Sequence, residues 1–348
     1  MVQTPARAAL RRLPLVTLYL TERCNSRCVT CDYWRHGRID LTLDALERLL
    51  PELQRLQTQV VLISGGEPLL HPQWREMAQR LRTNGQSLWL LTSGLSLAKH
   101  ARRVGELFDA VTVSLDGTTA ATYAAIRGLD AFDKVCEGIR AAADTAVALS
   151  VRVTLQRANY QELPAFVELA HRLGAQQVSF LAVDVANPHA FGRSDEFRAD
   201  VGLRAEDLPV LAALLCQLQR EHAQDFERGF IAENPAKLQR LLQYFTAVHG
   251  HGSYPPVRCN APEFSAVVDA QGRVAPCFFI PGPPAPMFSA AALADLNAPA
   301  MRALRQDIED GRRAECTTCV CSMWREPSTL EHLRFRPAGL GAAPRRWQ

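Results

Sequence analysis

Short apolar runs alternate with longer amphipathic segments between residues 15 and 183. The short runs are rich in Val, Leu and Ile, and they predict strands at 15–20, 59–64, 87–92, 110–115, 150–155 and 177–183. The longer segments place apolar residues at helical spacing, which predicts helices between the strands. Strands that alternate with helices in this way indicate an α/β fold with a parallel sheet covered by helices.

Three residues within the helical patterns carry further expectations. Pro51 lies inside the helical pattern at 42–56, and we expect the helix to end or kink there because proline lacks the backbone N–H. Cys136 and Cys216 lie in apolar helical patterns, so both are expected to be core residues.

Polar and glycine-containing segments follow the predicted strands. In parallel barrels, the residues that carry out chemistry lie at the C-terminal ends of the strands. The side chains that we therefore expect at one mouth, together with a cysteine-rich loop after the first strand, are Glu67, Ser93, Ser114, Asp116, Asp184 and His189.

The loop after the first strand contains Cys24, Cys28 and Cys31 at C-x3-C-x2-C spacing, and we call it the three-cysteine loop. A structural zinc site uses four protein ligands and disulfides pair cysteines in even numbers, so three adjacent thiols fit neither. Three thiolates on a four-iron cluster leave one iron open to a small molecule. The spacing therefore predicts a [4Fe-4S] cluster with an open iron.

A second region follows the Gly-, Pro- and His-containing segment 249–256, and its first part reads as a hairpin with a turn at 269–272. Its five cysteines are Cys259, Cys277, Cys316, Cys319 and Cys321. The C-x2-C pair within this set fits either an iron–sulfur cluster or a structural zinc site.

Charge and hydropathy disfavour two other classes of protein. The net charge is +3, but the arginines that carry it are interspersed with Asp and Glu instead of forming a basic block, which disfavours a nucleic-acid-binding protein. No apolar run reaches the roughly 18 residues of a membrane span, and the N-terminus lacks a signal-peptide pattern. We expect a soluble cytoplasmic protein, in which ten cysteines indicate metal or redox chemistry.

The three-cysteine loop and the Gly-Gly-Glu-Pro motif at 65–68 together resemble the radical S-adenosylmethionine (SAM) superfamily, and the resemblance extends over roughly residues 15 to 325. It implies a partial (β/α)6 TIM-like barrel. It also implies that the [4Fe-4S] cluster of the three-cysteine loop binds SAM through its open iron.

The same resemblance implies a set of SAM-binding residues. Gly65, Gly66 and Glu67 match the motif that receives the amino group of SAM, and Ser114 and Arg127 match positions near its carboxylate and ribose. Ser93 stands where the family more often has asparagine near the ribose. Thr30 replaces the usual aromatic residue beside the adenine, a role that Tyr33 or Trp34 could take instead.

The second region resembles the SPASM or Twitch modules of this superfamily, which carry auxiliary clusters. The implied ligands of one auxiliary [4Fe-4S] cluster are Cys259, Cys277, Cys316 and Cys319, with Cys321 either spare or in place of Cys319. The expected organisation is an extension at 1–14, the barrel at 15–200, a helical connection at 201–250, the auxiliary-cluster module at 251–330 and a tail at 331–348.

The resemblance implies reductive cleavage of SAM to a 5′-deoxyadenosyl radical that abstracts hydrogen from a substrate. We expect a two-electron oxidation of a small polar molecule, such as a sugar or aminocyclitol alcohol, in which Arg152, Asp184 or His189 binds or deprotonates the hydroxyl. A reduced flavodoxin- or ferredoxin-type protein would supply the electron. The alternatives are a peptide maturase that forms crosslinks or thioethers or epimerises residues, an iron–sulfur electron carrier, and a zinc-bearing nucleic-acid-binding module.

Overall fold

A computed structural model describes residues 9–193, 199–280 and 293–326 of the chain. The expected tail at 331–348, residues 1–8 of the expected extension, and residues 281–292 and 327–330 of the expected module lie outside these residues. The strands are β1 Leu15–Tyr19, β2 Val60–Ser64, β3 Ser87–Thr92, β4 Ala110–Ser114, β5 Ala148–Leu155, β6 Gln177–Ala182, β7 Ser265–Val268 and β8 Val274–Ala275. The α-helices are α1 Leu43–Arg55, α2 Trp74–Thr83, α3 Leu97–Leu107, α4 Ala120–Arg127, α5 Phe132–Ala143, α6 Leu163–Arg172, α7 Leu208–Glu221, α8 Ala223–Arg228, α9 Pro235–Val248, α10 Ala261–Phe264, α11 Pro299–Glu309 and α12 Ala314–Thr317.

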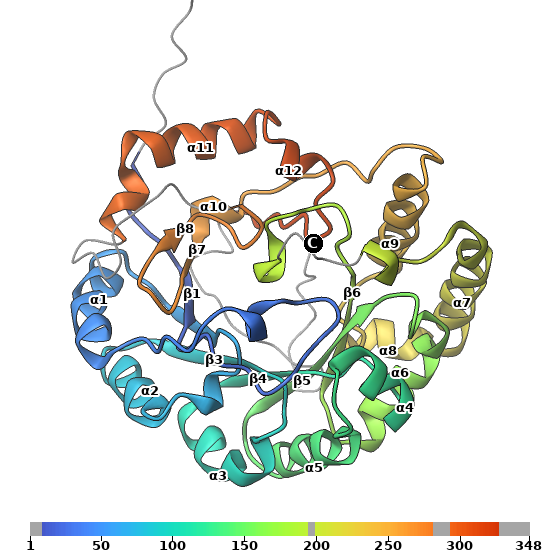
Figure 1. Ribbon diagram of the computed structural model, residues 1–348, viewed down its shortest axis with the longest axis horizontal. Coiled ribbons are helices and arrows are strands. Elements are labelled where there is room, and N and C mark those ends of the chain that lie inside the picture. The colour runs from blue at the N-terminus through green and yellow to red at the C-terminus, as the bar shows by residue number, and fades with distance from the viewer. Residues whose placement is uncertain (1–8, 194–198, 281–292, 327–348) are drawn as a thin grey trace, which may run out of the picture.

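The strands form one sheet in the order β6-β5-β4-β3-β2-β1-β7-β8. Neighbouring strands from β6 to β1 are parallel, and helices lie along the outside of the sheet, as Figure 1 shows for α1, α2, α3 and α5. The prediction of a partial (β/α)6 TIM-like barrel is therefore confirmed.

Alternation along the strands divides the barrel into an apolar outer face and a partly polar inner face. Outward residues such as Val61, Val111 and Val151 belong to the main hydrophobic core beneath the helices. The inner face has a small apolar cluster of Leu15 and Val60, which lie at the starts of their strands. Polar residues occupy the inner face nearer the C-terminal strand ends, so the barrel interior can accommodate a polar ligand at its mouth.

The C-terminal region continues the barrel sheet. Strand β7 pairs in parallel with β1, with Leu15 opposite Ser265, and β8 returns antiparallel to β7. This β7–β8 pair confirms the expected hairpin, because Gly272 N–H donates to the Asp269 carbonyl at the turn. Helices α11 and α12 lie on the part of the ring opposite α3 and α5 (Figure 1). The cysteines of this region are thereby brought close to the barrel mouth.

Two expectations are wrong in detail. Helix α1 does not end at Pro51 but continues to Arg55, because Pro51 is exposed while Leu49 and Leu53 are buried in the core. Cys216 is exposed, whereas Cys136 is buried as expected. The buried face of α7 consists of Leu211, Leu215 and Leu218, and a residue next to Leu215 points away from that face.

Among the described helices, none has both the length and the apolar character needed to cross a membrane.

Candidate active site

The three-cysteine loop is held against the C-terminal end of α4. The backbone N–H of Arg27 donates to the carbonyl of Arg127 at 3.0 Å, and that of Val29 donates to Ile126 at 3.0 Å. Gly128 ends α4 in the left-handed conformation, where a Cβ would lie 2.5 Å from the Arg27 carbonyl oxygen. The loop therefore pairs with carbonyl groups that a helix leaves free at its C-terminus.

The Gly-Gly-Glu motif packs against the chain that leads into the three-cysteine loop. Gly66 N–H donates to the Thr21 carbonyl at 2.9 Å, and Glu67 N–H donates to the Arg23 carbonyl at 2.7 Å. A Cβ on Gly66 would lie 2.3 Å from the Arg23 carbonyl oxygen. Glycine is required here because the two backbones touch.

The Glu67 carboxylate is buried and connects the ends of β2 and β3. One oxygen accepts from the Thr92 hydroxyl at 2.8 Å and from Leu69 N–H at 3.2 Å. The other accepts from both the backbone N–H and the hydroxyl of Ser93, each at 2.7 Å. All four hydrogen-bond donors to this carboxylate come from the protein, so Glu67 fixes the ends of β2 and β3. The backbone of the two glycines is then the part of the motif that remains available to contact a ligand.

Arg127 and Ser114 flank the loop from the α4 and β4 sides. Arg127 forms a buried ion pair with Asp116 at 2.7 Å, and its Nη1 donates to Cys28 Sγ at 3.6 Å. Burial lowers the pKa of Arg127, but the Asp116 carboxylate and the Cys28 thiol outweigh that effect and raise it above the ordinary value. Ser114 is half-buried at the end of β4. Arg127 is therefore a fixed positive charge beside the loop.

Burial disfavours the thiolate form of cysteines in this loop. It raises the pKa of the Cys24 thiol to about 11 and raises that of Cys31 further, while hydrogen bonds from the backbone of Ser26 and Tyr33 respectively act in the opposite direction. Thiols in such surroundings become thiolates when they bind a metal.

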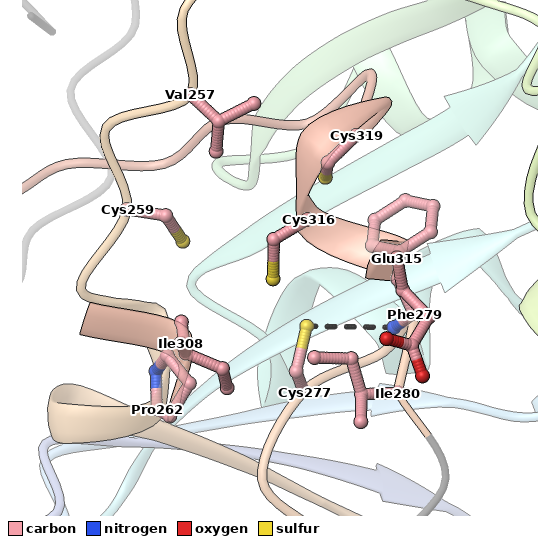
Figure 2. Close-up of a pocket in the computed structure, with 10 residues that line it drawn as sticks. All are labelled: Val257, Cys259, Pro262, Cys277, Phe279, Ile280, Ile308, Glu315, Cys316 and Cys319. Atoms are coloured by element: carbon pink, nitrogen blue, oxygen red, sulfur yellow. Dashed lines mark hydrogen bonds between the residues drawn. The ribbon is translucent and has the colours of Figure 1, made fainter. Parts of the chain in front are cut away.

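Four further cysteines converge in a pocket formed by the C-terminal region. Figure 2 shows the sulfur atoms of Cys259, Cys277 and Cys316 pointing toward one another, with Cys319 beside them on the α12 side. Apolar side chains, including Ile280 and Ile308, line the rest of this four-cysteine pocket. Burial raises the pKa of the Cys316 thiol to about 11 and raises that of Cys277 as well.

Five of the predicted ligand cysteines accept a hydrogen bond from the backbone N–H two residues further on. The donors are Ser26 for Cys24, Tyr33 for Cys31, Ala261 for Cys259 at 3.5 Å, Phe279 for Cys277 at 3.4 Å and Cys321 for Cys319 at 3.4 Å. Such N–H···S bonds stabilise the negative charge of iron–sulfur clusters and tune their potentials. The same local geometry thus occurs at both cysteine sites.

Cys321 occupies a different position from the other C-terminal cysteines. It does not line the four-cysteine pocket, and its backbone N–H donates to Cys319 Sγ at 3.4 Å. Burial raises the pKa of the Cys321 thiol to about 12, with the nearby Cys319 and Cys259 thiols adding to this effect, while Lys237 and Arg152 oppose it. The arrangement favours Cys319 over Cys321 as a ligand.

Orphaned polar atoms also indicate missing ligands near the barrel mouth. Among the described residues, no partner is found for the buried atoms Ser26 Oγ, Trp34 Nε1, Arg127 Nε and Arg152 Nε. Within the same residues, no three His, Cys, Asp or Glu side chains lie close enough together to hold a single metal ion in this conformation. The fit to clusters therefore rests on the converging thiols, their N–H···S bonds and the orphaned atoms.

Arg152 lies on the inner face of the barrel, next to Ser114 and near the C-terminal Cys321. On β5 it is the register partner of both Ser114 on β4 and Ser179 on β6. Burial lowers the pKa of Arg152, and the nearby Glu233 carboxylate and Cys321 thiol partly offset this. Arg152 thus lies beside the SAM-binding candidate Ser114 in the sheet and, through Cys321, near the C-terminal cysteines.

Asp184 and His189 lie in the loop after β6 but in different surroundings. Asp184 is buried, accepts hydrogen bonds from Ala186 N–H and Asn187 N–H at 2.9 Å each, and forms an ion pair with Arg193 at 3.7 Å. Its Oδ2 has no hydrogen-bond partner among the described residues. His189 is exposed.

The environment of His189 includes the C-terminal region. Burial raises the pKa of Glu315, but its hydrogen bonds, Arg313 and His189 together lower it below the ordinary value. His189 therefore lies close to the helix α12 that carries Cys316.

The adenine-side candidates Tyr33 and Trp34 also differ from each other. The Tyr33 ring packs edge-to-face on Tyr19, with centroids 5.6 Å apart, while the Arg35 guanidinium lies over the Trp34 ring at 4.7 Å.

The sequence does not reveal the Asp116–Arg127 pair or the position of Glu233 beside Arg152. Asp116 was noted at a strand end, but no local pattern reveals its partner on α4. Phe191 carries no sequence signal of its left-handed backbone, with φ 57° and ψ 29°.

A parallel barrel with a three-cysteine loop at its mouth and a four-cysteine pocket beside it defines an iron–sulfur barrel protein. Residues 18–170 match the model of the Radical SAM superfamily. This match identifies the barrel as a radical SAM domain, and a [4Fe-4S] cluster and SAM are the cofactors expected of such a domain. The resemblance to members with SPASM/Twitch-type modules is likewise confirmed, at the level of the fold.

Curated relatives share part of the chain. It is 29% identical to pre-heme d1 synthase of Dinoroseobacter shibae over 62% of this chain and 55% of the relative. It is 29% identical to GTP 3′,8-cyclase of Erythrobacter litoralis over 58% and 60% of the two chains, and 31% identical to mycofactocin maturase MftC of Mycobacterium tuberculosis over 46% and 42%. The chain thus spans about half of the length of these relatives.

Solved structures share the fold more completely. Streptococcus suis SuiB bound to its precursor peptide SuiA superposes with a TM-score of 0.64 at 12% identity, over 90% of this chain and 72% of SuiB. The peptide-bound anSMEcpe structure superposes with a TM-score of 0.57 at 19% identity, over 77% and 75% of the two chains. These similarities extend the shared fold through the C-terminal region.

Proposed function

We propose that the chain is a radical SAM oxidoreductase that removes two electrons from a substrate bound in the barrel mouth. The observation that carries this proposal is the presence of two separate cysteine sites with the same N–H···S geometry. In this proposal Cys24, Cys28 and Cys31 hold the SAM cluster, and Cys259, Cys277, Cys316 and Cys319 hold an auxiliary [4Fe-4S] cluster. When bound, the first cluster supplies the electron that cleaves SAM and so provides a hydrogen-abstracting radical.

The residues of the mouth would bind SAM as follows. The Gly65 and Gly66 backbone would receive the amino group, because Glu67 is committed to four protein donors. Ser114 and Arg127 would approach the carboxylate and ribose. Ser93 would act through Glu67 and through Asn25, whose Oδ1 lies 3.5 Å from the Ser93 hydroxyl.

Arg152 is the substrate contact in this proposal. It stands beside Ser114 in the sheet register, on the inner face, and near the auxiliary site. Its Nε is buried and lacks a partner among the described residues, so an oxygen atom of a polar substrate would satisfy it. A guanidinium remains protonated in proteins, so Arg152 binds and orients the hydroxyl rather than removing its proton.

In the proposed oxidation of a secondary alcohol, every hydrogen, proton and electron that leaves the substrate has an acceptor. The carbinol carbon loses one hydrogen atom to the SAM-derived radical, the hydroxyl loses its proton to a base, and the remaining electron leaves through the auxiliary site. The product is a ketone. Asp184 and His189 are the base candidates, and the exposed His189 is the one that can exchange a proton with solvent.

The substrate we propose is a small polar alcohol of the sugar or aminocyclitol type. A peptide is the second candidate, because SuiB was solved with a precursor peptide and MftC is named a maturase. The names of the relatives cover heme synthesis, GTP cyclisation and peptide maturation, so barrel similarity alone does not select among them.

The electron donor in this proposal is a reduced flavodoxin- or ferredoxin-type protein. The mildly basic chain, with pI about 8.4, suits an acidic partner of this kind. An electron carrier with no reaction of its own is the remaining alternative, and SAM cleavage separates it from an enzyme.

The test uses the reconstituted protein with candidate alcohols and peptides deuterated at the reacting carbon. We expect deuterium in 5′-deoxyadenosine, one SAM consumed per ketone, and loss of label transfer in Arg152→Gln, while substrate-free SAM cleavage by that variant remains. A redox-neutral product, or SAM regenerated after each turnover, would rule out the dehydrogenase. Label transfer from a peptide alone would establish the maturase instead.

A further inference from the structure

One segment, the loop after β6, contacts the surroundings of both cysteine sites. On one side, the N–H of Asp32, which directly follows Cys31, donates to the carbonyl of Phe191 at 3.0 Å. On the other side, the Phe191 ring packs edge-to-face on Phe278 and Phe279, with centroids 5.1 Å and 5.9 Å away. Phe278 and Phe279 directly follow Cys277.

Phe191 has a backbone conformation that aromatic residues rarely adopt. Its φ of 57° and ψ of 29° lie in the left-handed region, where the Cβ crowds the backbone. Such a conformation persists only where the surroundings impose it. Here the Phe191 carbonyl accepts a hydrogen bond from the chain after Cys31, and the Phe191 ring packs on the chain after Cys277. These two contacts hold the residue in its unfavourable backbone conformation.

Buried polar contacts stiffen the loop around Phe191. The Arg193 guanidinium lies over the Phe191 ring at 5.7 Å, pairs with Asp184 at 3.7 Å, and donates to the Asp184 and Asn187 carbonyls. The side chains of Arg193 and Asp184 are 1% and 0% exposed. Asn187 Nδ2 also donates to the Phe279 carbonyl at 2.9 Å. The loop is thus tied to the C-terminal region at two points, through Phe191 and Asn187.

We propose that Phe191 is a positioning residue that couples the two cysteine sites, with its carbonyl fixing the chain after Cys31 and its ring fixing the chain after Cys277. The proposal rests on the proposed function, in which an electron passes to an auxiliary cluster at a fixed separation from the SAM site.

The coupling acts on the cluster potentials through neighbouring amides. Tyr33 N–H hydrogen-bonds Cys31, and Phe279 N–H donates to Cys277 at 3.4 Å. Both donors lie next to a residue that Phe191 contacts. Donors to cluster sulfur stabilise the more negative reduced state, so releasing Phe191 should weaken both bonds and lower both reduction potentials.

The test compares reconstituted wild type, Phe191→Ala, Phe191→Tyr and Phe191→Gly by hydrogen–deuterium exchange and potentiometry. The matched control is Phe226→Ala, which removes a half-buried ring on α8. We expect roughly tenfold faster amide exchange after Cys31 and after Cys277 in Phe191→Ala, as for a local opening, together with more negative potentials at both clusters. Phe191→Tyr should restore both readouts, and Phe226→Ala should change neither.

Phe191→Gly separates the two anchors. Glycine accepts the left-handed conformation, so the contact to Asp32 should persist and exchange after Cys31 should stay slow, while exchange after Cys277 rises. Unchanged exchange at either segment in Phe191→Ala, with both clusters loaded, would overturn the coupling. Equal loss of protection at both segments in Phe191→Gly would also overturn the two-anchor account. Absence of iron from the wild type would instead reject the proposed function.

Discussion

The Asp116 carboxylate lies 2.7 Å from the Arg127 guanidinium, and the two side chains are only 4% and 10% exposed. Asp116 also accepts Thr154 N–H at 2.7 Å, and Arg127 reaches Cys28, so the pair links β5 to the three-cysteine loop. A buried ion pair that loses one partner leaves an uncompensated charge, which costs far more than loss of an exposed pair.

Replacing Asp116 with Asn should therefore destabilise the protein by about 3–5 kcal/mol and lower iron loading of the SAM site. Urea unfolding and iron analysis measure the two effects. The matched control is Glu76→Gln, which removes a partner of Arg80 from an exposed helical pair and should leave the free energy of unfolding nearly unchanged. Equal stability of the two variants would show that the Asp116–Arg127 pair does not hold the loop.

Glu67→Gln tests whether this side chain fixes the strand ends. A glutamine amide offers one acceptor oxygen in place of two, so the hydrogen bonds to one of the two carboxylate oxygens are lost. We expect the free energy of unfolding to fall by about 2–4 kcal/mol. SAM binding, measured by equilibrium dialysis, should weaken together with stability. Normal stability with abolished SAM binding would mean instead that the carboxylate contacts SAM directly.

Gly66→Ala should prevent the close approach of the motif to the three-cysteine loop. The added Cβ would meet backbone atoms of Arg23, which cannot move aside as a flexible side chain would. We expect about half of the wild-type iron, because only the C-terminal site should load. Gly250→Ala is the control. Gly250 has a φ of +75° and no atom lies within 4 Å of the Cβ that the substitution adds, so this variant introduces backbone strain without a clash. Full iron content in Gly66→Ala would contradict the packing argument.

Cys319→Ala and Cys321→Ala distinguish the two candidates for the fourth auxiliary ligand. Cys319 lines the four-cysteine pocket and accepts an N–H···S bond, whereas Cys321 does not line that pocket. Cys319→Ala should lose the auxiliary cluster, and Cys321→Ala should retain the iron content and the spectrum of the wild type. The reverse result would move the ligand assignment to Cys321.

The sequence predicted the barrel because its strands and helices are marked by local apolar periodicity. Strand β7 was foreseen as part of a hairpin, but its parallel pairing with β1 joins residues far apart in the chain and leaves no local pattern. The same limit applies to the site. Cysteine spacing marked the ligand sets, whereas the four donors of Glu67, the partner of Arg127 and the backbone of Phe191 depend on tertiary contacts.

Two predictions from local sequence patterns were wrong because they did not take into account which side of the helix faces the core. Apolar neighbours in the sequence suggested a buried Cys216, yet the helical repeat turns that residue to the exposed side of α7. Proline suggested a break in α1, yet Pro51 faces solvent while the buried leucines hold the helix in place.

The most direct test of the two-site account is iron, sulfide and 5′-deoxyadenosine analysis after anaerobic reconstitution and reduction in the presence of SAM. Wild type should bind about eight irons per chain, and the triple variant with Cys24, Cys28 and Cys31 replaced by Ala should bind about four. That variant should form no 5′-deoxyadenosine, while Cys259→Ala/Cys277→Ala should hold about four irons and still form it. Formation of 5′-deoxyadenosine by the triple variant, or unchanged iron in the double variant, would contradict the account.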